Sequence, residues 1–71
     1  MLAERFVAIA ADGFETGKIV EIAVPEIRMD EISEIEHVGS GLLRFRYPGL
    51  EIDHYVIAEQ VLGFRIRPRD F

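Results

Sequence analysis

Two histidines and two serines are the side chains of this 71-residue chain most suited to metal binding or nucleophilic catalysis. His37 and His54 fall on two strand-like segments separated by a third, so they should lie ~9–10 Å apart, twice the strand spacing. That separation is too long for both to hold one ion, and the chain has no cysteine. Ser33 and Ser40 have no histidine and carboxylate at spacings that would activate a hydroxyl. We therefore expect structural histidines, with no metal, no cofactor and no catalysis.

Three arginines late in the sequence could bind an anion. Arg65, Arg67 and Arg69 alternate with Phe64 and Ile66, so an extended strand would project all three from one side. The sequence assigns them no carboxylate partner, and such a row could hold an anionic ligand or an acidic partner. Charges of this kind also protect a sheet edge against aggregation, and the pattern alone favours that role.

The acidic balance of the chain limits its partners. Thirteen Asp and Glu against eight Lys and Arg give a formal net charge of −5, which disfavours general binding to nucleic acid or anionic lipid. The acidic segment 26–36 could instead imitate a phosphate backbone, as a mobile element's inhibitor of a host defence protein would. Solvated sheet and loop charges are the simpler interpretation.

Composition also bears on folding and location. Hydrophobic residues make up 49% of the chain, which is enough for an ordered core. The longest apolar run, residues 6–11, is far shorter than the ~18 residues that span a bilayer, and a basic signal-peptide region is not apparent. We expect one domain, residues 1–71, without a membrane segment, and the lack of cysteine fits a reducing cytoplasm.

Glycine and proline divide the chain at strand-length intervals, and isoleucine, valine and aromatic residues fill the segments between them. This spacing is typical of an antiparallel β meander. The predicted strands are residues 5–10, 18–24, 33–38, 42–47, 50–58 and 62–67, with short helical turns near residues 29–32 and 58–61. Residues 12–17 would then form a hairpin loop with Phe14 at its tip, as a barrel plug or a binding anchor.

Charges in the middle of the chain favour one strand register. Hairpins closed by residues 39–41 and 48–49 would set the arginines of strand 42–47 between two rows of carboxylates. A slip of one residue would set charges against apolar groups, so this register is strongly favoured. The expected pairs are Glu36–Arg44, Glu34–Arg46, Arg46–Glu51 and Arg44–Asp53.

The same register gathers apolar residues at one end of the charged face. Val38, Leu42 and Tyr55 form a row just beyond the ion pairs, with Ile57 nearby. The solvent-facing side of a sheet does not normally end in four apolar groups. We therefore expect either another strand or a partner to cover them.

Residues 27–57, with an acidic turn, two hairpins and alternating Ile, Phe and Arg, resemble small SH3-like barrels. The meander predicts an all-β fold, a small antiparallel barrel or rolled sheet of five or six strands with one or two short helical turns. We expect a non-enzymatic protein–protein interaction module that binds a protein partner or self-associates through the apolar row or an open sheet edge. The alternatives are the acidic inhibitor and an anionic-ligand or RNA-binding barrel using the late arginines. The candidate contact residues are Arg65, Arg67, Arg69, Val38, Leu42, Tyr55, Ile57 and Phe14.

Overall fold

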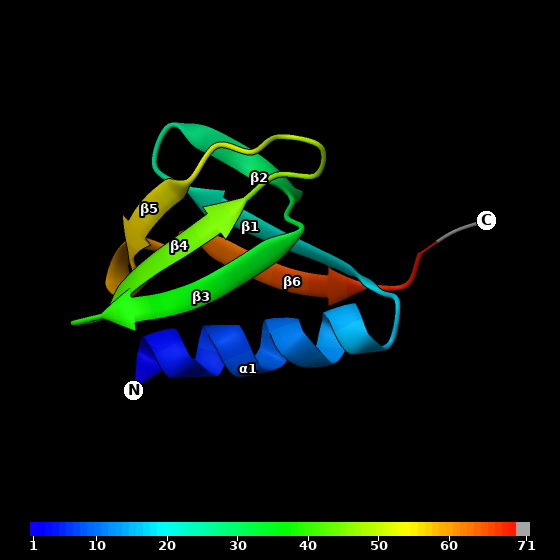
Figure 1. Ribbon diagram of the computed structural model, residues 1–71, viewed down its shortest axis with the longest axis horizontal. Coiled ribbons are helices and arrows are strands. Elements are labelled where there is room, and N and C mark those ends of the chain that lie inside the picture. Colours follow the sequence, from blue (N-terminus) through cyan, green and yellow to red (C-terminus); the bar gives the residue numbers. More distant parts are fainter. Residues whose placement is uncertain (70–71) are drawn as a thin grey trace.

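The computed structural model describes residues 1–69 as an N-terminal helix followed by two three-stranded antiparallel sheets (Figure 1). The elements are α1 (Leu2–Glu15), β1 (Ile19–Val24), β2 (Ile27–Glu31), β3 (Glu34–Gly39), β4 (Leu42–Arg46), β5 (His54–Ile57), the 3₁₀ turn η1 (Ala58–Gln60) and β6 (Gly63–Arg67). The strand orders are β2-β1-β6 and β3-β4-β5. The predicted antiparallel β character is confirmed, but the fold includes a full helix, and the described strands do not close into a barrel.

Helix α1 replaces a predicted strand at residues 5–10 and a predicted loop at residues 12–17, and both predictions were wrong. Its inward residues recur at spacings of three and four, as a helix requires. The fully or partly buried ones are Ala3, Phe6, Val7, Ala10, Gly13 and Phe14. The period is hard to recognise because the exposed side carries apolar residues as well, among them Ala8 and Ile9.

Gly13 lets the end of α1 lie directly against the first sheet. A Cβ atom at this position would lie 2.8 Å from Val20 Cγ2 and 3.0 Å from Ile66 Cδ1. Any larger residue would push the helix away from β1 and β6. The glycine is therefore part of the helix–sheet contact and not the loop residue that the sequence suggested.

The first sheet is built around β1, whose alternation the sequence predicted. Val20, Ile22 and Val24 are buried in the core, as the period of two implies. The helical turn predicted near residues 29–32 was wrong, because β2 is an extended strand paired with β1. Glu26, with φ of 72°, turns the chain back on itself after Pro25 and makes that pairing possible.

The β3–β4 hairpin has the predicted register. Glu36 lies opposite Arg44 and Glu34 lies opposite Arg46. Positive φ angles at all three residues of the segment 39–41 close the turn. The ladder shifts by one residue at this end, so that Gly39 and not Val38 lies opposite Leu42.

The β4–β5 register differs from the prediction by two residues. Arg44 lies opposite Tyr55 instead of Asp53. The N–H of Leu50 donates to the C=O of Tyr47 (3.2 Å), and Gly49 has φ of 78°, as a type II turn requires. Such a turn does not suit a tight hairpin, so β5 begins only at His54. A shift of two keeps every side chain on its predicted face.

The chain returns to the first sheet through η1 and β6. The helical turn predicted near residues 58–61 is confirmed by η1, and the strand predicted at residues 62–67 is confirmed by β6. β6 pairs antiparallel with β1, with Arg65 opposite Glu21 and Ile66 opposite Val20. The core lies between the sheets and α1, and its largest fully buried side chains are Phe45, Ile22, Ile32, Leu43 and Val20.

Candidate protein-interaction surface

Four apolar residues lie together on the outer face of the sheet β3-β4-β5. Val38, Tyr55 and Ile57 are 44%, 57% and 47% exposed. Leu42 is half-buried and lies opposite Ile57. We call these four residues the apolar row. The sequence led us to expect that either another strand or a partner covers the row. No strand among residues 1–69 does so.

Five charged residues form what we call the ionic cluster: Glu34, Glu36, Arg44, Arg46 and Asp53. The cluster adjoins the apolar row, since Arg44 lies opposite Tyr55. The Nε atom of Arg44 lies 2.6 Å from Glu36 Oε1, and its Nη1 atom lies 3.0 Å from Asp53 Oδ1. The Nε atom of Arg46 lies 2.6 Å from the same Asp53 oxygen and 3.2 Å from Glu34 Oε1. Three carboxylates thus surround two arginines. The expected structural ion pairing is confirmed for Glu34, Glu36 and Asp53.

The electrostatics of the ionic cluster favour the charged forms throughout. The hydrogen bond from Arg46 holds the pKa of the Asp53 carboxyl below its ordinary value. The hydrogen bond to Glu36 raises the pKa of Arg44 further above its already high value. Both arginines are therefore engaged by carboxylates of their own chain, and neither is free to grip a phosphate.

Glu51 does not make the predicted ion pair with Arg46. It lies in the loop before β5, because the register shift brings Asp53 to both arginines instead. Among residues 1–69 it forms no ion pair.

The late arginine row has carboxylate partners, which the sequence alone did not assign. The Nε atoms of Arg65 and Arg67 lie 2.6 Å and 2.9 Å from the same oxygen of Glu21. Arg69 lies 2.7 Å from Glu31 Oε2. The Glu21 carboxyl has a lowered pKa, mainly because Arg65 donates a hydrogen bond to it. These pairs span the first sheet, and only the strand order reveals them.

Phe14 is not an exposed binding anchor. It lies on α1 and packs partly buried against the core. The prediction of an aromatic at a hairpin tip was wrong because the segment is helical.

The two histidines occupy structural positions. His37 Nε2 accepts a hydrogen bond from the N–H of Gly41 (3.1 Å), which holds the β3–β4 turn. His54 lies opposite Phe45 in the β4–β5 ladder and stacks on it, with ring centroids 5.5 Å apart. No group of three or more metal-ligating side chains is found within the part of the chain that the structure describes.

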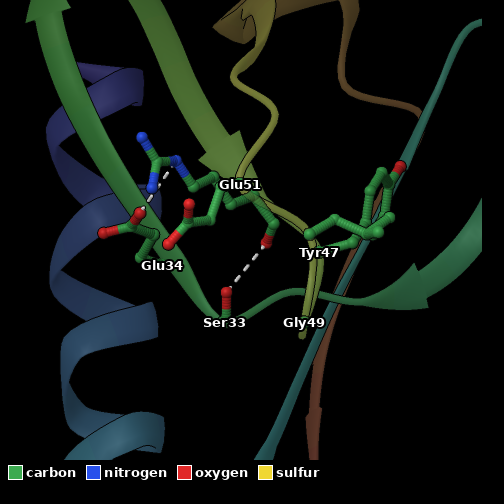
Figure 2. A pocket seen from close by; sticks show the side chains of 7 residues that line it. Ser33, Glu34, Tyr47, Gly49 and Glu51 are labelled. Atoms are coloured by element: carbon green, nitrogen blue, oxygen red, sulfur yellow. Dashed lines mark hydrogen bonds and ion pairs between the residues drawn. The ribbon is translucent and has the colours of Figure 1, made fainter.

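A hollow of about 570 Å³ lies beside the ionic cluster (Figure 2). Its lining residues are Ser33, Glu34, Arg46, Tyr47, Gly49, Leu50 and Glu51. The Ser33 hydroxyl donates to the C=O of Arg46 (3.3 Å), and Glu34 is paired with Arg46. No histidine lines the hollow, and the Ser33 hydroxyl donates to a backbone carbonyl and not to the lining carboxylates of Glu34 and Glu51.

The hydroxyl of Tyr47 is buried without a hydrogen-bond partner among the described residues. Burial raises the pKa of this hydroxyl. Its side chain points away from Glu34 and Glu51 (Figure 2). It is therefore a cost to stability and not a group presented to a ligand in the hollow.

Comparison of the chain with protein-family models, curated proteins and solved structures finds no match. Within residues 1–69, no helix combines the length and the apolar character needed to cross a membrane.

Proposed function

We propose that this chain is a non-enzymatic protein-interaction module whose contact surface is the apolar row. One observation carries the proposal: Val38, Tyr55 and Ile57 stay largely exposed beside Leu42 on one sheet face. About half of each side chain remains exposed, so burying that remainder in a contact supplies roughly 0.7–1.5 kcal/mol each. The ionic cluster beside the row gives a polar margin of fixed geometry, as protein interfaces have around an apolar centre.

The two alternative functions have less support. The late arginines would be the anion-binding groups, yet each of them contacts Glu21 or Glu31. The acidic inhibitor would present a run of unpaired carboxylates, yet within residues 26–36 Glu31, Glu34 and Glu36 are held by arginines of the same chain. Only Glu26 and Asp30 of this segment form no ion pair with a described residue. The apolar row is the surface that still needs an occupant.

The SH3-like resemblance is retained as part of this proposal. The N–H of Ile32 donates to Val20 in the first sheet, and the N–H of Ser33 donates to Arg46 in the second, both at 2.9 Å. Consecutive residues thus pass from one sheet to the other, and β6 returns to β1 after a 3₁₀ turn. We interpret the two sheets as the halves of an SH3-like rolled sheet that is extended at its start by α1.

A matched pair of variants tests the apolar row. Tyr55→Ser/Ile57→Ser removes two exposed apolar groups from the row, and Leu50→Ser/Ile52→Ser removes two of similar exposure from the neighbouring loop. Parent and variants are immobilised, and the proteins that each retains from a nuclease-treated lysate of the source cells, its own chain included, are quantified. The row variant should lose proteins that parent and loop variant retain equally. If the parent and both variants retain the same proteins, and circular dichroism shows that both variants are folded, the apolar row is ruled out as the contact surface.

A further inference from the structure

Two sheet edges are open within the part of the chain that the structure describes. β5 ends the sheet β3-β4-β5, and β6 ends the sheet β2-β1-β6. An open edge presents backbone N–H and C=O groups that can pair with another strand. The other two end strands are less suited, because α1 packs along β3 (Figure 1) and β2 has an irregular register with exposed charges.

The ladder between β4 and β5 decides which backbone groups of β5 face outward. The N–H of Ala58 donates to the C=O of Gly41 (2.9 Å). In an antiparallel ladder the bonding alternates, so the even-numbered residues of β5 direct their backbone groups to β4. Tyr55 and Ile57 therefore direct theirs to the open edge, and both also carry exposed apolar side chains.

The same reasoning applies to β6. The C=O of Val20 accepts the N–H of Ile32 in the direction of β2, so the odd-numbered residues of β1 bond to β6. Glu21 lies opposite Arg65, and these two are therefore a bonded pair. Phe64 and Ile66 are left with backbone groups that face the open edge.

We propose that β5 of one copy pairs antiparallel with β6 of a second copy of this chain. This inference rests on the proposed function and names its partner. Setting Tyr55 opposite Ile66 and Ile57 opposite Phe64 uses the outward backbone groups of all four residues. Opposite residues share a sheet face, so Tyr55 and Ile57 of one copy would lie beside Ile66 and Phe64 of the next, on the face where those two half-buried side chains pack against α1.

Charge complementarity favours a second copy as the occupant. Residues 50–60 contain Glu51, Asp53 and Glu59 and no Lys or Arg, whereas residues 62–70 contain three Arg and the single acid Asp70. Asp53 is already paired with Arg44 and Arg46, so Glu51 and Glu59 are the acidic groups that remain on the first segment. Within one molecule Arg65 and Arg67 share a single carboxylate, which leaves positive charge at the β6 edge. Glu51 and Glu59 form no ion pair with a described residue. The attraction between these edges opposes the repulsion between copies of net charge −5.

The two edges differ, so the contact is heterologous. Each copy that offers β5 to one neighbour still has a free β6 for another. Such contacts close into a ring if the rotation between copies permits it, and otherwise extend into a filament.

Light scattering after size exclusion, over a range of protein concentrations, tests the proposal on the full chain. The parent should give masses above the 8.1 kDa of one chain, and they should fall with dilution and with added salt. Glu51→Arg/Glu59→Arg should weaken association several-fold. The control Asp12→Arg/Glu15→Arg, which reverses two exposed charges of α1, makes the same change in net charge and should not weaken it.

The outcomes separate the two proposals. A parent that stays monomeric at every concentration overturns the second-copy inference, and the apolar row is then judged by its own capture experiment. Equal weakening in both charge variants also overturns the edge pairing. If an added basic protein binds the row while the parent remains monomeric, the occupant is that other partner and the inference is wrong.

Discussion

At the scale of single residues, Glu21 is the buried charged side chain among the described residues. It is only 6% exposed, and it accepts hydrogen bonds from Arg65 and Arg67 on one oxygen. A carboxylate buried to this degree is stable only with such partners. The ion pairs that the two arginines form with Glu21 link β6 to β1 and so help to stabilise the first sheet.

Glu21 should make stability depend on pH in the acid range. Its folded pKa lies below the ordinary 4.5, so its contribution is fully present above that value and is lost as pH falls through the lowered one. Glu21→Gln should cost about 1–2 kcal/mol near neutral pH, a value reduced because both arginines are half exposed. It should also flatten the fall of the thermal midpoint below about pH 5. Calorimetry across this range measures both, and an unchanged pH slope would contradict the assignment.

The buried hydroxyl of Tyr47 gives an opposite prediction. Because this hydroxyl has no hydrogen-bond partner among the described residues, Tyr47→Phe should leave the free energy of unfolding unchanged or raise it by up to about 1 kcal/mol. Tyr55→Phe, at an exposed position, serves as the control and should change little. A loss of more than about 1 kcal/mol in denaturant melts would mean that the Tyr47 hydroxyl is bonded.

At the scale of elements, β1, β3, β4 and β6 could be predicted because their apolar alternation is visible in the sequence. The β3–β4 register followed from charges eight to twelve residues apart. The sequence did not reveal α1, because apolar residues occur on both sides of this helix. The predicted β4–β5 register was wrong by two residues, because the length of the loop and not the charges set where β5 begins. The partners of the late arginines lie 38 to 46 residues away, where sequence pattern alone gives no pairing.

The contact of α1 with the first sheet depends on Gly13. Alanine is the better helix former by about 1 kcal/mol, yet its Cβ would lie 2.8 Å from the stiff side chain of Val20. Gly13→Ala should therefore destabilise the protein by about 1–2 kcal/mol net, as overpacking does. Ala11→Gly, at an exposed position on the same helix, isolates the propensity effect. If Gly13→Ala raises the free energy of unfolding in urea melts, the close packing of α1 at Gly13 against Val20 and Ile66 is contradicted.

Charge exchange tests the pairing within the ionic cluster. Arg44→Glu places a fourth carboxylate among Glu34, Glu36 and Asp53 and should lower the thermal midpoint. Glu36→Arg in that background restores an opposite pair across β3 and β4 and should recover part of the loss. Strictly additive effects of the two changes on the midpoint would contradict the register.

At the scale of the whole molecule, the predicted apolar row is present and exposed, and the position of Tyr55 and Ile57 on an end strand agrees with the contact surface proposed above. The sequence could place these residues on one face because the period of a strand is two. It could not show that β5 and β6 are both open edges, since that depends on strand order. Leu62, in the segment between η1 and β6, is a further exposed apolar side chain at 72%.

Amide hydrogen exchange, resolved by residue and followed against protein concentration, tests the edge pairing most directly. The amides of Tyr55, Ile57, Phe64 and Ile66 should become more protected as concentration rises, because their N–H groups then bond to a neighbouring copy. The amides of Val56 and Arg65, already bonded within their own sheets, should show no such dependence. Exchange of the first four amides at rates independent of concentration would contradict the account.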